Sequence, residues 1–275
     1  MKATPPCICR RHFSGTLFKA ATGLTLAGWL GGARAQEGSG AATGAATGAA
    51  HDASAIHQPK SMRSKALETG ANILQSHAPV DAMSAYLNGF HFYADDMGRQ
   101  VEAHHYCTHL SEDFHQCVIF DSNEPGAKLI GIEYIVSERV FKSLPDDEKR
   151  LWHSHHYEVK SGELAAPGIP DIAEQALMKD LVTTYGKTWH TWQIDRDKAL
   201  PLGIPQLMMG FTQDGQLDGA LVQSRDARLG VSAAEDREKR ADIPMPAVVP
   251  GANAWESGTS LQLQLVEVPL RNRRP

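Results

Sequence analysis

Short runs rich in apolar and β-branched residues recur through the middle of the chain and predict strands separated by turns. Residues 110–113 (Leu-Ser-Glu-Asp) separate two such runs, and Asp214-Gly215 is a typical turn dipeptide. The predicted strands are residues 104–109, 115–120, 128–136, 153–160, 188–194 and 207–212. Near the end of the chain, leucine and glutamine alternate over residues 261–265 and predict one further, half-buried strand.

Apolar residues at helical spacing predict helices between these strands. Pro170-Asp171 begins a helix whose apolar side chains share one face and which ends at Gly186. A shorter helix is predicted over residues 61–76, and Pro145 with the acidic residues after it predicts a helix start that leads to Leu151. Short turns and interspersed helices are typical of an α+β fold, here a single domain with helices packed on a mainly antiparallel sheet.

Composition divides the chain into four segments. Residues 1–35 have the features of a signal peptide, and residues 36–60 are a Gly/Ala-rich flexible linker that repeats the tetrad Ala-Ala-Thr-Gly. Residues 61–230 carry most of the predicted elements and form the folded α+β domain. Residues 231–275 are a C-terminal extension with a charged stretch, a proline-rich stretch and the last predicted strand.

The first segment predicts export from a bacterial cell. Arg10-Arg11 precedes a mildly apolar run, residues 20–30, which is too short to span a membrane, and Ala33-Arg34-Ala35 is a small-x-small cleavage pattern. The paired arginines favour the twin-arginine route, and an ordinary secretory signal is the alternative. The sequence therefore predicts a periplasmic or secreted protein.

The charge of the mature chain excludes some partners. Cleavage after Ala35 would remove five of the 27 basic residues and none of the 32 acidic ones, leaving 22 basic residues and a formal charge of −10. This balance argues against nucleic acid as a partner. No apolar stretch of the mature chain is long enough to be a transmembrane segment. The oligomeric state is left open.

Cys107 and Cys117 are the two cysteines outside the signal segment. A turn centred on Glu112 places them directly opposite each other on two antiparallel strands and places His109 opposite His115. A disulfide between the cysteines fits this register and an oxidising compartment. A soft metal site made by both cysteines with His109 and His115 is one alternative, and two buried thiols are the other.

The histidines are the candidates for chemistry, and seven of the thirteen lie between His104 and His156. Alternate residues of a strand share a face, so His153 and His155 project together while Glu158 is expected on the opposite face. Two such imidazoles can bind zinc, iron or copper with a third ligand from another element. The candidate metal ligands are His105, His109, Glu133, His153, His155 and His190. The alternative is that these histidines are packed, hydrogen-bonded core residues.

Sequence motifs of well-known enzyme classes are missing. The chain has no His-Glu-x-x-His metalloprotease motif, no Gly-x-Ser-x-Gly nucleophile elbow, no Gly-x-Gly-x-x-Gly and no P-loop. Whether the protein is an enzyme is therefore left open by the residues themselves.

A series of ordered blocks resembles the oil body-associated protein family, a domain of unknown function found in plants, fungi and bacteria. The blocks begin with residues 104–107 (His-His-Tyr-Cys), 116–117 (Gln-Cys) and 129–136 (Leu-Ile-Gly-Ile-Glu-Tyr-Ile-Val). Further blocks are residues 144–149, 151–155, 158–162, 185–187, 189–193, 200–209 and 214–216. The resemblance covers roughly residues 66–221, which is most of the predicted domain.

The resemblance implies a place in the cell more than a reaction. Plant members of the family associate with seed oil bodies, and no catalytic mechanism comes with the family. For this chain, the export signal points to the bacterial envelope. The first hypothesis is therefore a non-enzymatic protein associated with lipid or an envelope component. The alternative is a periplasmic metal-binding protein or metalloenzyme that uses the histidine cluster, with zinc as one possible cofactor.

Overall fold

The computed structural model describes residues 58–271, which belong to one compact unit of the chain. The predicted signal peptide, residues 1–35, and nearly all of the predicted linker lie outside the described residues. Seven antiparallel strands form one sheet in the order β4-β3-β2-β1-β7-β6-β5. The strands are β1 (Ala85–Tyr93), β2 (Asp96–Ser111), β3 (Phe114–Phe120), β4 (Leu129–Val136), β5 (His153–Ser154), β6 (Tyr185–His190) and β7 (Gln206–Met209).

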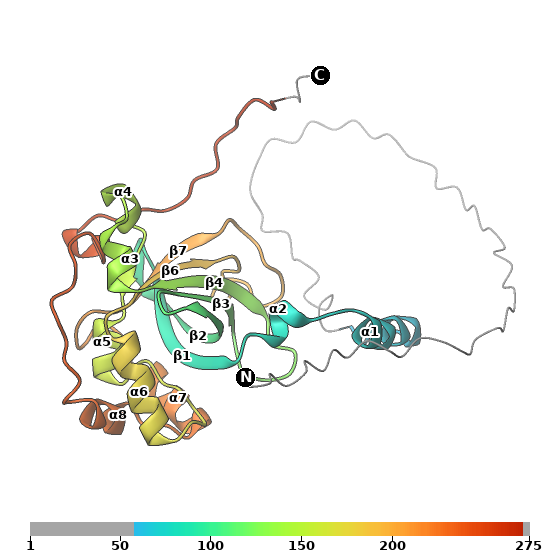
Figure 1. The fold of residues 1–275 in the computed structure, drawn as a ribbon. Coiled ribbons are helices and arrows are strands. Elements are labelled where there is room, and N and C mark those ends of the chain that lie inside the picture. Colours follow the sequence, from blue (N-terminus) through green and yellow to red (C-terminus); the bar gives the residue numbers. More distant parts are fainter. Residues whose placement is uncertain (1–57, 272–275) are drawn as a thin grey trace, which may run out of the picture. The chain divides into compact units, whose positions relative to one another are not determined.

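The sheet closes on itself because β4 also pairs with β6, from Gly131↔His190 to Val136↔Tyr185. Strands β1, β2, β3, β4, β6 and β7 therefore make a six-stranded barrel, shown in Figure 1. The predicted antiparallel sheet with helices is confirmed, but its closure was not predicted. Closure gives the sheet an inside, and that inside holds the candidate site.

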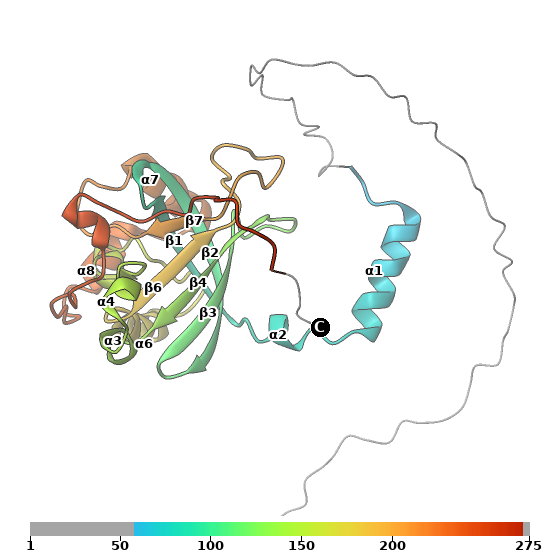
Figure 2. The same cartoon turned by 90° about the horizontal axis from the view of Figure 1, so that it is seen from above.

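Helices form most of the remaining regular structure in residues 58–271. They are α1 (Met62–Leu74), α2 (Ala78–Asp81), α3 (Glu138–Lys142), α4 (Asp146–Lys149), α5 (His156–Ser161), α6 (Asp171–Leu181), α7 (Gly219–Leu229) and α8 (Ala233–Lys239), with a 3-10 turn, η2 (Ala254–Ser257). In both views α3 to α8 lie to one side of the barrel (Figure 1 and Figure 2). Within residues 58–271, no helix is long and apolar enough to cross a membrane.

The hairpin of β2 and β3 follows its predicted register. Cys107 pairs with Cys117 and His109 with His115, although an irregularity follows between His109 and Ser111. The helix predicted over residues 61–76 is α1, capped by the Ser61 side chain, but it has no buried residue. The helix predicted from Pro170 is α6, which ends at Leu181, so Gly186 is not its end and lies instead in β6.

The predicted strand over residues 153–160 is wrong after its second residue. Strand β5 is His153–Ser154, and α5 begins at His156 with the amide of Val159 donating to the carbonyl of His155. The helix ends at Gly162, whose φ of 80° is the left-handed conformation that glycine adopts without strain. Because the backbone is helical at Glu158, its side chain does not lie on the face that was expected for a strand.

Two buried arginines hold the end of α5. Arg240 donates to the carbonyls of Val159 and Leu164, and Arg225 donates to the carbonyls of Gly162 and Glu163. The last carbonyls of a helix lack partners within the helix, and cationic donors satisfy them well. These arginines come from α7 and the end of α8, so the C-terminal helices fix the segment that carries Glu158.

The predicted strand over residues 261–265 is absent, because one side chain takes the place of strand pairing. The Gln262 side chain accepts from the backbone amide of Leu207 and donates to the carbonyl of the same residue. The carbonyl of Leu207 accepts from the backbone amide of Ala94 as well, so Gln262 adds a side-chain contact to β7 and no backbone pairing. The C-terminal extension therefore runs past β7 as an irregular segment, and its charged stretch lies mostly in α8.

Candidate metal centre

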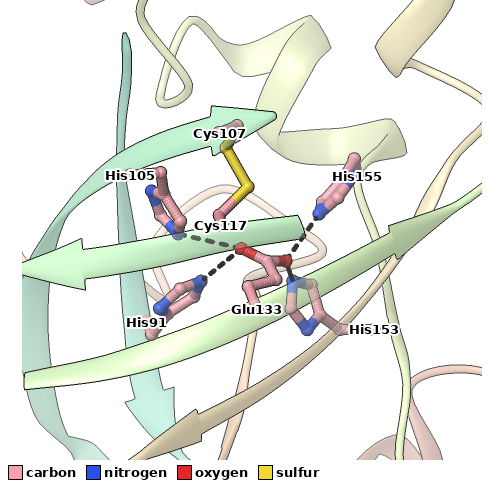
Figure 3. Close-up of a disulfide and its surroundings, with 7 residues drawn as sticks. All are labelled: His91, His105, Cys107, Cys117, Glu133, His153 and His155. Carbon is pink, nitrogen blue, oxygen red and sulfur yellow. Dashed lines mark hydrogen bonds and ion pairs between the residues drawn. A yellow bond between two sulfur atoms is a disulfide. The ribbon is translucent and has the colours of Figure 1, made fainter. Parts of the chain in front are cut away.

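Strand register brings the candidate side chains to the inside of the barrel. Glu133 on β4 pairs with Cys117 on β3 and with Thr188 on β6, and Cys117 pairs with Cys107 on β2. Directly opposed residues of antiparallel strands share a face, and so do residues two apart on one strand. His105 therefore joins this inner row, as Figure 3 shows.

Glycines leave room for these large polar side chains. A Cβ at Gly186 would lie 2.0 Å from Glu133 Oε1 and 2.8 Å from the His153 ring. A Cβ at Gly131 would lie 2.8 Å from the His190 ring, and one at Gly210 would lie 2.8 Å from Glu158 Oε1. Such distances are far inside van der Waals contact. The three glycines therefore leave room for the side chains in and beside the site, and none of them is there to form a turn.

Four imidazoles surround the Glu133 carboxylate. His155 Nε2 and His153 Nε2 lie 3.2 Å and 3.4 Å from Oε1. His105 Nε2 lies 2.9 Å from Oε2, and His91 Nε2 lies 4.0 Å from it. Each of these residues is 5 % exposed or less. Figure 3 shows the two pairs on opposite sides of the carboxylate.

Not every predicted ligand joins this cluster. His190 contacts the cluster only through His91, with its Nε2 3.4 Å from His91 Nδ1. His109 is exposed and stacks on His115, with ring centroids 4.1 Å apart, at a distance from Glu133 and its imidazoles. His105, Glu133, His153 and His155 are brought together, as the sequence hypothesis required.

Two members of the site were not among the predicted ligands. His91 lies on β1, where residues on both faces are buried and no polar alternation marks the inner side. Glu158 reaches the site from α5, and its carboxylate oxygen lies within 4.8 Å of ligand nitrogens of His153 and His155. A single histidine between Phe90 and Phe92 was the one available signal for His91.

Burial and neighbouring charge determine protonation in the site. Burial by itself raises the pKa of Glu133, but the imidazoles of His105, His153 and His155 hold that pKa well below its usual range. Burial, with the negative charges of Glu133 and Glu163, raises the pKa of Glu158 well above its usual range.

Burial favours the neutral form of three imidazoles in and beside the site. Burial lowers the pKa of His91 and of His153, and it lowers the pKa of His190 to about 3. A neutral imidazole has the free lone pair that a metal ion needs. The barrel interior therefore holds at least three imidazoles, those of His91, His153 and His190, whose burial favours the form that can bind a metal.

The hydrogen bonds of His155 determine which of its nitrogens carries the proton. Thr184 Oγ1 donates to the carbonyl of Leu181 at 2.7 Å, so it must accept from His155 Nδ1, also at 2.7 Å. In the neutral ring, Nε2 then presents a lone pair to Glu133 Oε1, 3.2 Å away. Two acceptors that face each other in a buried site repel, so a cation or a proton has to lie between them.

Other polar atoms of the cluster lack partners. Among the described residues, Nδ1 of His105, of His153 and of His190 has no hydrogen-bond partner although each atom is buried. Leaving buried polar groups unpaired costs free energy, and native structures rarely do so without a ligand or water. The unpaired polar atoms of the interior therefore favour a bound polar or charged ligand.

The ligand atoms fall into two groups of three that share His153. One group is His91, Glu133 and His153, and the other is His153, His155 and Glu158, with the ligand atoms of each group within 4.8 Å of one another. Imidazole and carboxylate ligands suit zinc, iron, copper and manganese. The structure joins the nearby Cys107 and Cys117 in a disulfide, so these sulfurs are not ligands.

Comparison with known proteins agrees with the sequence resemblance. The family model described as a protein of unknown function, DUF1264, matches residues 77–244. Oil body-associated protein 1A of Zea mays is 49 % identical over 214 residues, which cover 77 % of this chain and 90 % of the relative. The chain belongs to the oil body-associated protein family. All six site residues lie within the part of this family member that the model matches, namely His91, His105, Glu133, His153, His155 and Glu158.

Other members of the oil body-associated family are similar over comparable lengths. Oil body-associated protein 1B of Arabidopsis thaliana is 46 % identical over 74 % of this chain and 85 % of its own length. Oil body-associated protein 2B of Zea mays is 40 % identical over 79 % of this chain and 90 % of its own length. No solved structure matches the chain.

Proposed function

We propose that this oil body-associated family member binds a divalent first-row transition metal inside its barrel. The observation that carries the proposal is the position of His155, whose Nε2 lies 3.2 Å from Glu133 Oε1 while its Nδ1 donates to Thr184 Oγ1, so that a neutral ring would turn a lone pair towards the carboxylate. A metal ion between them turns this repulsion into two bonds. His105, His153 and His91 supply further nitrogen ligands around the same carboxylate.

The charge environment supports a cation. Among residues 58–271, no lysine or arginine forms an ion pair with Glu133 or Glu158, whose partners are imidazoles. Two buried carboxyl groups without a basic partner favour a bound cation over an anion. Zinc, iron, copper and manganese all accept this donor set, so the proposal extends to the class of metal and not to one element.

Elemental analysis tests the proposal. The protein is purified without a metal-affinity tag, beside a His153→Ala/His155→Ala variant and a His109→Ala control. Near-stoichiometric metal is expected in the wild type and in the control, because His109 lies outside the cluster, and it should be lost in the double variant. A wild-type protein that arrives free of metal and takes up no added Zn²⁺, Mn²⁺ or Fe²⁺ would contradict the proposal.

Lipid association is a second candidate function. Its supports are the relatives, which are named for association with oil bodies, and a row of exposed apolar side chains in the C-terminal extension. Leu265, Val268 and Leu270 are 83 %, 76 % and 88 % exposed. Exposed apolar residues that recur along one segment are typical of an interaction surface.

Flotation with vesicles tests the lipid candidate. The protein should float with zwitterionic phosphatidylcholine vesicles, and a Leu265→Ser/Val268→Ser/Leu270→Ser variant should stay at the bottom of the gradient. An Ile172→Ser variant, altered at an apolar residue of α6 that is 88 % exposed, is the matched control and should float. Equal recovery of all three proteins at the bottom would rule out this function.

Export to the bacterial periplasm completes the proposal. It rests on Arg10-Arg11 and the cleavage pattern at Ala35, and the Cys107–Cys117 disulfide supports it because disulfides persist in oxidising compartments. Cell fractionation should find the processed wild type in the periplasm and an Arg10→Lys/Arg11→Lys variant unprocessed in the cytoplasm. Normal export of the variant would indicate an ordinary secretory signal instead.

A further inference from the structure

The two oxygens of the Glu133 carboxylate face two different pairs of imidazoles. His153 and His155 approach Oε1, whereas His105 and His91 approach Oε2 (Figure 3). A carboxylate that serves one ion needs its ligands on one side. Here the imidazoles are divided between its two ends, which is the arrangement of a carboxylate that bridges two ions.

We infer that the barrel holds two metal ions bridged by Glu133, an inference that rests on the metal binding proposed above. One ion takes Glu133 Oε1, His153, His155 and Glu158, and the other takes Glu133 Oε2, His105 and His91. Paired ions in proteins lie about 3.5–4 Å apart. A carboxylate whose two oxygens each bind one ion fits that spacing.

The distances of the imidazoles from the two carboxylate oxygens follow this division, although His153 also lies within 4.8 Å of the ligand atom of His91 and so stands where the two halves meet. Metal bonds of about 2.0–2.2 Å to nitrogen and oxygen place neighbouring ligand atoms roughly 2.8–3.6 Å apart for octahedral to tetrahedral angles. His155 and His153 lie 3.2 Å and 3.4 Å from Oε1, and His105 lies 2.9 Å from Oε2. His91, at 4.0 Å from Oε2, needs a small movement inward to share the second ion.

Glu158 belongs to the first half of the site. Its carboxylate lies with His153 and His155 in one group of possible ligands, whereas His91 and Glu133 lie in the other group with His153. The helix α5 that carries Glu158 is pinned by Arg240 and Arg225, so this carboxylate is placed by rigid structure. Its side chain gives the first ion an oxygen ligand besides the bridge.

A small cavity lies between the two halves. Its volume is about 20 Å³, and it is lined by His91 and His105 of one half, by His155 and Glu158 of the other, and by Glu133 between them. Its remaining wall is aliphatic, including Leu87 and Leu164. A cavity needs roughly 10–15 Å³ to hold one water molecule, so this one takes a ligand of one or two heavy atoms.

The expected occupant of the cavity is a water-derived hydroxide that touches both ions. Two divalent ions carry four positive charges, and Glu133 and Glu158 supply two negative ones. An anionic oxygen bridge reduces the remaining charge, and metal ions lower the pKa of bound water enough to form it near neutral pH. Larger ligands, such as a sugar or an acyl chain, do not fit between the two halves.

Metal counting tests the two-ion arrangement. The mature protein is stripped with a chelator, loaded with Zn²⁺, desalted and analysed for metal per chain. Two equivalents are expected in the wild type and in the control His109→Gln. His91→Gln and His155→Gln, which each remove one ligand from a different half, should retain one equivalent each.

Loading with Mn²⁺ adds a test that metal counting lacks. Two Mn²⁺ ions bridged by one carboxylate couple magnetically, so the six-line resonance of the protein with one equivalent should be lost at two equivalents. One equivalent in the wild type would overturn the two-ion inference and leave metal binding in place. Two equivalents without coupling would overturn the bridge. No uptake at all would overturn metal binding itself.

Discussion

His104 and His105 are neighbours in the sequence, yet they lie in two buried polar clusters of opposite character. His104 faces outward from β2, with Nδ1 2.8 Å from the hydroxyl of Tyr86 and Nε2 3.1 Å from Glu102. His105 faces inward, towards Glu133. Since residues next to each other on a strand point to opposite faces, one strand supplies both clusters.

The two clusters differ in how the chain balances their charge. In the outer cluster, Glu102 accepts from Asn88 and pairs with Arg228, and Arg225 donates to Asn88. In the inner cluster, every ion-pair partner of Glu133 within residues 58–271 is an imidazole. A cluster balanced by its own arginines is structural, whereas one that lacks a cation is a candidate to bind one.

Removing the metal should have the largest effect on the unfolding free energy, and this effect should depend on the inner cluster and not on the outer one. A ligand present at 1,000 times its dissociation constant stabilises the folded state by about 4 kcal/mol, so chelation should lower the unfolding free energy by an amount of that order. Urea unfolding with and without Zn²⁺ measures the effect. Glu133→Gln should abolish the difference, and the outer-cluster control Glu102→Gln should keep it. If metal stabilised both variants by the same amount, the inner cluster would not be the metal site.

Filling the space beside Glu133 should have the next largest effect. A Cβ at Gly186 would overlap Glu133 Oε1 at 2.0 Å, so Gly186→Ala should destabilise the protein by about 3 kcal/mol and impair metal uptake. Gly219→Ala is the matched control, because a Cβ there meets no atom within 4 Å. Thermal unfolding and metal content of both variants test this. A Gly186→Ala protein as stable and as metal-rich as the control would show that the inner row can shift freely.

The hairpin that joins the clusters was predictable from sequence, but the inner cluster as a whole was not. The turn at Glu112 places Cys107 opposite Cys117, which is a local relation along the chain. Barrel closure pairs Gly131 with His190, and no local periodicity encodes such a distant contact. The inside of the barrel, and hence the convergence on Glu133, depends on that closure.

Two ligands escaped prediction for separate physical reasons. His91 lies on a strand that is buried on both faces, so its sequence lacks the alternation that marks an inner side. Strand β5 is only two residues long, and the backbone turns into α5 before it reaches Glu158. The alternation of His153, His155 and Tyr157 looks like a strand, and the tertiary contacts of Arg240 and Arg225 with the end of α5 favour the helix instead.

The disulfide should contribute stability without contributing to the metal centre. Closing the short loop between Cys107 and Cys117 stabilises the folded state by roughly 2–3 kcal/mol in the chain-entropy account. Cys107→Ala/Cys117→Ala should lose that amount in urea unfolding and retain its metal, because neither sulfur is a ligand. Alkylation of the unreduced mature protein, which lacks Cys7 and Cys9, should label no thiol. Two labelled thiols, or metal loss in the variant, would contradict this separation.

Glu163 lies between the two clusters and should make stability depend on pH. Its carbonyl accepts from Arg225 of the outer cluster, and its negative charge raises the pKa of Glu158 in the inner one. Burial raises the pKa of Glu163 itself to about 7, from an ordinary value of 4.5. The folded protein therefore keeps a proton that the unfolded chain releases.

The sign of the effect follows from that difference. The contribution of Glu163 is fully present below pH 4.5 and is lost as the pH rises through 7, by up to about 3 kcal/mol. Glu163→Gln resembles the protonated carboxyl, so it should match the wild type near pH 4.5 and exceed it in unfolding free energy at pH 8.

Histidines with lowered pKa values, such as His115, act in the opposite direction but equally in both proteins. The comparison of variant and wild type by urea unfolding therefore isolates Glu163, and the exposed Glu112→Gln should show no such dependence. A variant that stays parallel to the wild type from pH 4.5 to pH 8 would mean that Glu163 ionises in the folded protein as readily as in the unfolded chain.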